Sequence, residues 1–294
     1  MRTERWLKRN TERLDGRLVA ITGATGGLGG ALCRHLLALG ASLVLLDRNR
    51  EKSNALRATL GREFEGASIE QITLDLADMA SVRAACDALE QMPLDVLIHN
   101  AGAYSIPRKT CDTGYDNVFQ INFVSPYYMT RRLLPLLEKR AGRVVAVGSI
   151  AHRYSKTDER DVDFSARRQA SLVYGNAKRY LMYALWALFD GQSRASLAVT
   201  HPGISFTGIT AHYPPLLFAL IKHPMKLIFM RPRRAALSLL RGVFAPTGMR
   251  EWWGPRLFDV WGLPRCRRVH SASEQEREEI AARAACIYQK LSDV

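Results

Sequence analysis

Three side chains in the second half of the chain have the chemistry needed to move a proton to or from an oxygen atom. Tyr174 and Lys178 are four residues apart in an apolar stretch that predicts a helix, so their side chains lie on one helix face. Ser149 follows the apolar run 144–147, which predicts a strand. A nearby ammonium lowers the pKa of a phenol, so this tyrosine is expected to exchange a proton near neutral pH while the serine hydroxyl holds the reacting oxygen. Because a tyrosine four residues before a lysine is common by chance, the interpretation depends on a cofactor site beside it.

A glycine-rich turn near the N-terminus predicts that cofactor site. The segment TGATGGLG, residues 22–29, follows a short apolar run at 17–22 and precedes an apolar stretch with helical spacing at 31–39. Glycines let the backbone approach a pyrophosphate, and a helix N-terminus presents N–H groups and the positive end of the helix dipole to it. Asp47 ends the next apolar run, 18 residues after Gly29, where a carboxylate can bind the adenosine ribose. This order predicts a dinucleotide site.

The elements that must hold these residues alternate along the chain. Strands are predicted at 17–22, 42–46, 68–74, 94–99, 142–148 and 194–200, and helices at 31–39, 50–60, 80–91, 113–140 and 173–189. Strands that are apolar throughout and separated by helices indicate a parallel sheet covered on both faces. The expected fold is therefore α/β, a single doubly wound Rossmann-type sheet.

The alternation is lost beyond Thr200. Prolines interrupt the apolar pieces, three of the five tryptophans fall within residues 252–261, and residues 271–291 predict a charged terminal helix. We therefore expect a charged N-terminal leader at 1–16, a dinucleotide-binding and catalytic core at 17–210, and a substrate lid, irregular cap and terminal helix at 211–294 that are continuous with the same domain.

Charge and cysteine content limit the remaining possibilities. The 294 residues carry a formal charge of +14, and residues 222–270 hold eleven lysines and arginines against Glu251 and Asp259. A solvated basic face is the preferred interpretation, and contact with an anionic membrane surface is the alternative. No nucleic-acid-binding module is recognisable, so no nucleic-acid partner is expected. The five scattered cysteines favour reduced thiols and no metal site, and the charged leader is no signal peptide, so a cytoplasmic protein is expected.

Together these motifs resemble the classical type of the short-chain dehydrogenase/reductase family over about residues 17–207. The matching residues are TGATGGLG at 22–29, Asp75-Leu76, Asn100-Ala101-Gly102, Asn122, Ser149, Tyr174 with Lys178, and Pro202-Gly203 with Thr207. The stretches RVVAVGSIAH (143–152) and YGNAKRYLMYAL (174–185) are most similar to the retinol-dehydrogenase type. Two positions depart from the family pattern: His99 replaces the usual asparagine, and Ala177 replaces the usual serine.

The resemblance implies a role for each matching residue. Tyr174 would be the catalytic acid or base, Lys178 would tune it and bind the nicotinamide ribose, Ser149 would orient the substrate carbonyl, and Asn122 would hold a water in a proton relay. The residues expected to bind the cofactor are Gly23, Thr25, Gly26, Gly27, Leu28, Gly29, Asp47, Arg48, Asp75, Leu76, Asn100, Ala101, Gly102, Tyr174, Lys178, Pro202, Gly203, Ile204 and Thr207.

The implied reaction interconverts a hydroxyl and a carbonyl on a lipophilic small molecule, with hydride transfer to or from the cofactor. NAD is favoured because Asp47 would repel a 2′-phosphate, whereas Arg48 could pair with that phosphate and admit NADP. The apolar residues of 212–230 suggest a substrate lid, or core packing, or a segment that dips into a membrane surface. A homodimer or homotetramer through the long helices is expected by analogy.

Two other functions compete with this one. A dinucleotide-binding regulator without turnover would be marked by loss of Tyr174, Lys178 or Ser149, all of which are present. A nucleotide-sugar epimerase or dehydratase would have a longer substrate domain and a G-x-x-G-x-x-G turn.

Overall fold

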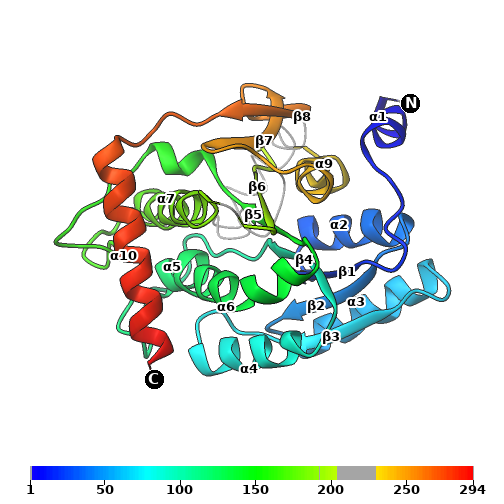
Figure 1. Ribbon diagram of the computed structural model, residues 1–294, viewed down its shortest axis with the longest axis horizontal. Helices are drawn as coiled ribbons and strands as arrows, with labels where there is room; N and C mark the ends of the chain where they lie inside the picture. Colours follow the sequence, from blue (N-terminus) through cyan, green and yellow to red (C-terminus); the bar gives the residue numbers. More distant parts are fainter. Residues whose placement is uncertain (1, 192, 204–229, 294) are drawn as a thin grey trace, which may run out of the picture.

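A single eight-stranded sheet organises the chain. The computed structural model describes residues 2–191, 193–203 and 230–293 (Figure 1). The strands are β1 (Leu18–Thr22), β2 (Ser42–Asp47), β3 (Ile69–Thr73), β4 (Leu94–His99), β5 (Arg143–Val147), β6 (Ser196–Thr200), β7 (Glu251–Leu257) and β8 (Trp261–Arg268). Their order in the sheet is β3-β2-β1-β4-β5-β6-β7-β8. Every neighbouring pair is parallel except β7 and β8, which form an antiparallel hairpin.

The central strands are apolar throughout because both faces of the sheet are covered. In β1, Leu18 and Ala20 belong to one core cluster, whereas Val19 and Ile21 belong to the other. Successive side chains of a strand point to opposite faces, so a strand buried on both faces needs an unbroken apolar run. The doubly wound parallel sheet predicted from the sequence is thus confirmed.

Two layers of helices cover the sheet (Figure 1). The described helices are α1 (Arg2–Asn10), α2 (Gly27–Ala38), α3 (Arg50–Glu63), α4 (Met79–Glu90), α5 (Asn117–Phe119), η1 (Gln120–Val124), α6 (Ser125–Lys139), η2 (Ile150–Arg153), α7 (Ala170–Leu188), α9 (Pro232–Phe244) and α10 (Glu274–Ser292). Buried residues of α2, α3 and α9 form one core cluster, and those of α4, α6, α7 and α10 form the other. The predicted terminal helix is α10, and it packs across α7 and α6.

The C-terminal region is more regular than the sequence indicates. Where an irregular cap is predicted, β7 and β8 continue the sheet and α9 covers it. The tryptophans belong to these strands, and Trp252 is completely buried. Four arginines and two facing prolines, Pro255 and Pro264, hide the strand pattern in the sequence, and prolines are tolerated in strands at a sheet edge. Of the predicted lid, residues 212–229 lie outside the described residues.

The long helix predicted at 113–140 begins later, at Asn117, and contains one wide turn. Residues 120–124 form a π-helical turn between α5 and α6. Within the described residues, no helix is long and apolar enough to cross a membrane, and no group of three His, Cys, Asp or Glu side chains is arranged to hold a metal ion.

Candidate active site

The glycine turn between β1 and α2 has the close backbone packing that a dinucleotide site requires. Gly23 has a positive φ of 69°, in the left-handed region that favours glycine. A Cβ on Gly29 would lie 2.3 Å from the Gly23 carbonyl oxygen and 2.8 Å from the Ala24 Cα, so only glycine fits there. Gly26, the N-cap of α2, has no side chain to cap the first turn. The N–H groups at this helix end suit a pyrophosphate.

Asp47 is held in place at the end of β2 by two hydroxyl side chains. Its Oδ1 accepts hydrogen bonds from the Thr25 backbone N–H at 3.0 Å and from the Thr25 hydroxyl at 2.9 Å. Its Oδ2 accepts a hydrogen bond from the Ser53 hydroxyl at 3.0 Å. The carboxylate is thereby attached to the glycine turn, whereas the next residue, Arg48, is exposed. The two residues that argue for different cofactors therefore lie in different environments.

Asn100 joins β4 to the glycine turn. Its Nδ2 donates to the carbonyl oxygens of Thr22 and Gly23 at 2.9 and 3.0 Å, and the Thr22 hydroxyl accepts from the N–H groups of Asn100 and Ala101. Asn100 Oδ1 is buried and accepts no hydrogen bond from any of the described residues. A buried amide oxygen without a partner is costly, so this atom is a candidate acceptor for a ligand hydroxyl.

The π-helical turn places Asn122 against the loop that follows Asn100. Asn122 Nδ2 donates to the Ala103 and Val118 carbonyl oxygens, both at 2.8 Å, and its Oδ1 accepts from the Ala103 N–H at 3.2 Å. A Cβ on Gly102 would lie 2.9 Å from Asn122 Oδ1 and 3.6 Å from Lys178 Nζ. Asn122, Gly102 and Lys178 therefore meet, and π turns occur often at functional sites.

The three proton-transfer candidates are also brought together. Ser149 follows β5 and begins η2, where its hydroxyl accepts from the Ala151 N–H at 3.2 Å. The Ser149 side chain lies close enough to the Tyr174 phenol to lower its pKa. Lys178, one turn further along α7, lies with its Nζ 5.7 Å from the centre of the Tyr174 ring and donates to the Val147 carbonyl oxygen at 2.9 Å.

The electrostatics of this group differ from the sequence-based expectation. Burial raises the pKa of Tyr174 to about 12, although the Ser149 side chain acts in the opposite direction. Burial also lowers the pKa of Lys178 to about 7. Lys178 is not among the groups that shift the pKa of Tyr174. Desolvation disfavours the charged form of both groups, and the bond from Lys178 goes to an uncharged carbonyl.

His99, one of the two departures from the family pattern, has a structural role. Its Nε2 is 2.8 Å from the Thr130 hydroxyl on α6. Burial, with a smaller contribution from Lys178, lowers the pKa of His99 to about 3. The imidazole is therefore neutral at physiological pH and connects β4 to α6.

The remaining predicted cofactor residues lie along the same edge of the sheet. The Asp75 side chain accepts from the Ala77 N–H at 2.9 Å, and the Leu76 carbonyl oxygen accepts from the Ser125 hydroxyl at 2.6 Å. Gly203 has a φ of 79° and packs against the β7–β8 hairpin. Pro202 precedes it and is half-buried. Ile204 and Thr207 lie outside the described residues.

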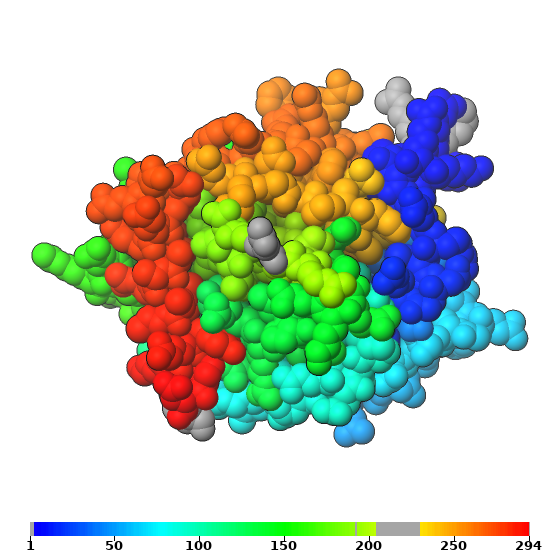
Figure 2. Space-filling view, viewed as in Figure 1, coloured from blue at the N-terminus to red at the C-terminus, as the bar shows by residue number. Residues whose placement is uncertain are grey.

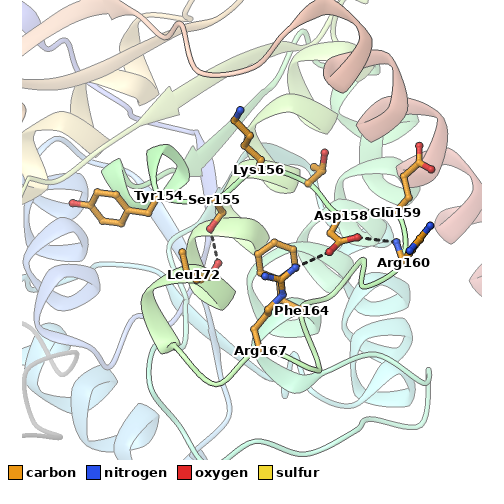
Figure 3. A pocket seen from close by; sticks show the side chains of 10 residues that line it. Tyr154, Ser155, Lys156, Asp158, Glu159, Arg160, Phe164, Arg167 and Leu172 are labelled. Carbon is orange, nitrogen blue, oxygen red and sulfur yellow. Dashed lines mark hydrogen bonds and ion pairs between the residues drawn. The ribbon is translucent and has the colours of Figure 1, made fainter.

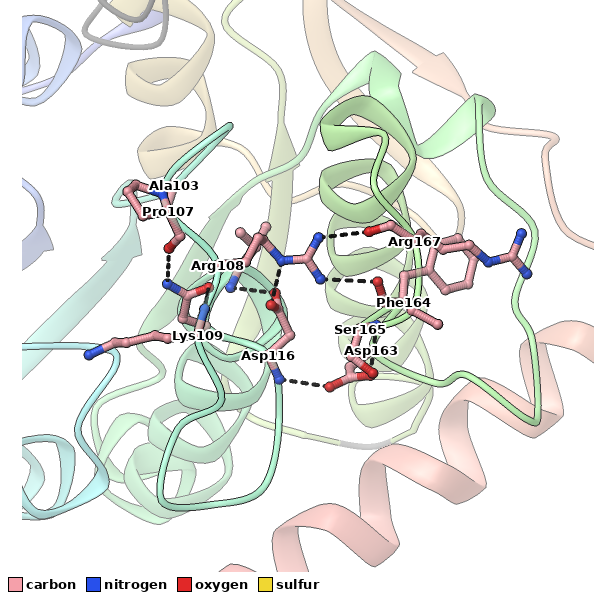
Figure 4. A network of polar contacts seen from close by, with 12 residues as sticks. Ala103, Pro107, Arg108, Lys109, Asp116, Asp163, Phe164, Ser165 and Arg167 are labelled. Carbon is pink, nitrogen blue, oxygen red and sulfur yellow. Dashed lines mark hydrogen bonds and ion pairs between the residues drawn. The ribbon is translucent and has the colours of Figure 1, made fainter.

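Sequence reasoning missed a network that joins the loop before α5 to the loop between η2 and α7 (Figure 4). Arg108 donates to the Asp116 carboxylate and to the carbonyl oxygens of Phe164 and Arg167, the latter two at 3.0 and 3.1 Å. The Asp116 N–H donates to Asp163 at 2.7 Å. The contacts to residues 163–167 join positions 47 to 59 residues apart, so nothing local in the sequence indicates them.

A second missed contact fixes the helix that carries Tyr174 and Lys178. Arg179 is only 1% exposed, and it donates to Glu276 of α10 through Nε at 2.7 Å and Nη2 at 2.5 Å. It also donates to the carbonyl oxygens of His152 and Ser271. The Glu276 carboxylate accepts in addition from the N–H and hydroxyl of Thr157. The C-terminal helix thus anchors both α7 and the loop after Ser149.

That loop also borders a hollow of about 540 Å³ (Figure 3). Its lining is rich in charge, with Asp158 lying between Arg160 and Arg167, and Ser155 donates to the Leu172 carbonyl oxygen. Neither Ser149 nor Tyr174 belongs to the lining. The hollow is therefore separate from the proton-transfer group.

Comparison with known proteins agrees with this geometry. The sequence profile of the family described as short chain dehydrogenase matches residues 17–158. Retinol dehydrogenase 14 from Mus musculus is 32% identical over 69% of this chain and 66% of its own length. Dehydrogenase/reductase SDR family member 13 from Bos taurus is 34% identical over 79% of this chain and 63% of its own length. The chain therefore matches less than two thirds of the length of these relatives.

The fold is also similar to a solved structure over almost its full length. The crystal structure of a putative uncharacterized protein from Mycobacterium paratuberculosis has a TM-score of 0.71, with 26% identity and 97% coverage of both chains.

Proposed function

Because the chain belongs to the short-chain dehydrogenase/reductase family, we propose that it interconverts a hydroxyl and a carbonyl group with a nicotinamide cofactor. The observation that carries this proposal is the meeting of Ser149, Tyr174 and Lys178 at the edge of the sheet where the glycine turn also lies. The carboxyl ends of parallel strands are where ligands bind in folds of this kind.

The residues present fit a dinucleotide. The uncapped first turn of α2 suits the pyrophosphate, and Asn100 Oδ1, which has no partner in the described part of the chain, can accept a hydrogen bond from a ligand hydroxyl. A bound nicotinamide dinucleotide supplies or accepts the hydride.

The protein supplies the proton and holds the substrate. In the reducing direction the Tyr174 hydroxyl donates its proton to the substrate carbonyl oxygen, while the Ser149 hydroxyl holds that oxygen by a hydrogen bond. In the oxidising direction Tyr174 accepts the hydroxyl proton. Asn122 uses both amide hydrogens to hold the backbone at Ala103 and Val118. A relay water at this position would therefore be held by main-chain atoms.

NAD is the favoured cofactor, and two features support it. Asp47 ends β2 at the edge of the dinucleotide site, and Thr25 and Ser53 keep its carboxylate there. A fixed negative charge beside the adenosine ribose repels a 2′-phosphate. Replacing Asp47 with serine should raise the kcat/KM ratio of NADPH over NADH by about tenfold or more. A wild-type protein that strongly prefers NADPH would overturn this choice, and Arg48→Ala would then identify the phosphate partner.

The proposed substrate is a lipophilic alcohol, aldehyde or ketone. Support comes from the similarity to a protein named retinol dehydrogenase and from the apolar composition of residues 212–230. Of that segment only Met230 is described, and it is buried against Gly203.

The test measures turnover of a panel of lipophilic alcohols, aldehydes and ketones through the change in absorbance of the nicotinamide cofactor. Tyr174→Phe should lower kcat by about a hundredfold or more, the usual contribution of a positioned acid or base, while cofactor affinity changes little. Tyr180→Phe is the matched control, because Tyr180 lies on the same helix and packs against Phe119 and Phe123. Turnover that survives in Tyr174→Phe would refute the assigned role. Tight cofactor binding without turnover of any substrate would favour the non-catalytic regulator.

A further inference from the structure

The tip of the β7–β8 hairpin exposes large apolar side chains at the edge of the sheet that carries the site. Of the described residues, five large apolar side chains are exposed. Three of them lie on this tip, namely Leu257, Phe258 and Trp261, with 53%, 89% and 40% of their surface exposed. A fourth, Tyr154, follows Arg153, which contacts Asp259 of the tip at 3.1 Å. Isolated exposed apolar residues are ordinary, but a group of them indicates an interaction surface.

The tip lies beside the candidate active site. β7 runs parallel to β6, so its end at Leu257 shares the sheet edge with the carboxyl ends of the other parallel strands. A Cβ on Gly203 would lie 2.5 Å from the Val260 carbonyl oxygen. On the other side, Arg153 ends η2, the short helix that begins after Ser149. Whatever binds the tip is therefore close to the proton-transfer residues.

The backbone of the tip has a conformation that is unfavourable for phenylalanine, and Phe258 is nevertheless the most exposed of the large apolar residues described. Phe258 and Asp259 have φ values of 52° and 56°, and the Val260 N–H donates to the Leu257 carbonyl oxygen at 2.9 Å. Two successive positive φ values are typical of hairpin turns in which asparagine and glycine are preferred. A phenylalanine there costs free energy, and such strain is concentrated at functional positions.

Positive charge surrounds this apolar tip. Residues 230–270 contain nine arginines and two carboxylates. Of the arginines on the hairpin, Arg256, Arg265 and Arg268 are exposed, and the hairpin lies at the upper rim of the molecule, coloured orange in Figure 2. Asp259, one of the two carboxylates, is already paired with Arg153 and lies 3.9 Å from Arg267. An apolar wedge flanked by arginines complements the interface of an anionic bilayer.

We propose that the β7–β8 tip docks the protein on an anionic lipid bilayer, with Leu257 and Phe258 inserted among the lipids and the surrounding arginines on the headgroups. The docking itself does not depend on turnover. Its consequence for catalysis, direct entry of a lipophilic substrate from the bilayer, rests on the function proposed above.

The experiment is co-sedimentation of the full chain with vesicles of phosphatidylcholine alone or containing about one third phosphatidylserine. Wild type should bind the anionic vesicles and lose binding as salt is raised. Phe258→Ser should weaken binding about tenfold or more, since burial of one large apolar side chain is worth at least that factor. Met249→Ser is the matched control, because Met249 is 41% exposed at the other end of the hairpin, and it should bind like wild type.

Three results would overturn the proposal. The first is a wild type that does not bind anionic vesicles. The second is a Phe258→Ser variant that binds vesicles like wild type but has a higher KM for a detergent-dispersed substrate. This result would make the tip part of the substrate site. The third is a concentration-dependent dimer that Phe258→Ser abolishes without vesicle binding, which would make the occupant a second copy. Two results distinguish this proposal from the proposed reaction. A Phe258→Ser variant that loses vesicle binding but keeps normal turnover supports the docking site and leaves the reaction intact, whereas a wild type that binds vesicles but turns over no substrate supports the docking and refutes the reaction.

Discussion

The ion pair between Arg179 and Glu276 should contribute strongly to stability, and removal of its acidic partner tests this. In Glu276→Ala, the Arg179 guanidinium, which is 1% exposed in the wild type, keeps only its bonds to the His152 and Ser271 carbonyl oxygens. Removing one partner of a buried ion pair costs about 3–5 kcal/mol because a buried charge is left uncompensated. Because two carbonyl oxygens still accept hydrogen bonds from Arg179, we expect the free energy of unfolding to fall by an amount at the lower end of this range, about 3 kcal/mol.

The assay is thermal unfolding followed by circular dichroism. For a chain of this length the entropy of unfolding is about 0.6 kcal/mol/K, so 3 kcal/mol corresponds to a decrease in Tm of about 5 °C. Arg179→Met should lower Tm by less than Glu276→Ala does, because Glu276 is 14% exposed and keeps its bonds to Thr157. The double variant should be more stable than Glu276→Ala alone, since it leaves no buried charge. Glu278→Ala, at an exposed position of the same helix, should change Tm by less than about 1 °C.

The pH dependence supplies an independent check. The pKa of Glu276 is lowered by its bonds to Arg179 and Thr157, which outweigh the effect of burial. A lowered folded-state pKa gives stability that is present above the unfolded value of 4.5 and is lost as pH falls through the folded value. The Tm difference between wild type and Glu276→Ala should therefore shrink below pH 4.5. A Tm difference under about 1 °C at pH 7, or a double variant less stable than Glu276→Ala, would refute the reasoning.

Three further results are expected. Gly29→Ala should lower Tm by several degrees and abolish dinucleotide binding measured by calorimetry. Gly27→Ala should leave Tm nearly unchanged, because its Cβ would come no closer than 3.8 Å to any described atom outside its own helix turn; an equal loss of Tm in the two variants would contradict the packing argument. Lys178→Met should raise Tm more at pH 7 than at pH 10. The folded-state pKa of Lys178, about 7, lies below the unfolded value of 10.5, so the free-energy cost of burying the amine decreases as pH rises from 7 to 10.5. A Tm difference that does not change with pH would show that the amine is solvated in the folded protein. A thiol reagent should label exposed Cys286 in the native protein but label Cys33, whose pKa burial raises to about 12, only after unfolding; rapid labelling of Cys33 would indicate local opening.

The sequence predicts the part of the molecule where local pattern and spacing carry the information. The apolar run of β1, the glycines that follow it and Asp47 are recognisable because each reports a local requirement, namely burial on two faces, close backbone approach and the end of a strand. Tyr174 and Lys178 are recognisable because four residues on a helix fix their relative position.

The rest depends on contacts between distant segments. The sequence does not show that burial raises the pKa of Tyr174 and lowers that of Lys178, because desolvation depends on every element packed around the pair. Nor does it show the strands β7 and β8, whose arginines and prolines do not alternate with apolar residues in the usual way. The partnership of Arg179 with Glu276 joins residues 97 positions apart, and no local pattern indicates it.

The position of α10 has a consequence for how the protein associates with itself. Ile280, Ala284, Ile287 and Leu291 of α10 are buried in the same core cluster as residues of α6 and α7, and in Figure 2 the red terminal helix lies against the green segments. A homodimer that used the part of α6 and α7 covered by α10 would first have to displace this helix and the ion pair of Arg179. One copy of the chain thus completes this part of its own core, and this face does not need a partner chain to cover it, as it would in proteins whose Tm rises with protein concentration for that reason.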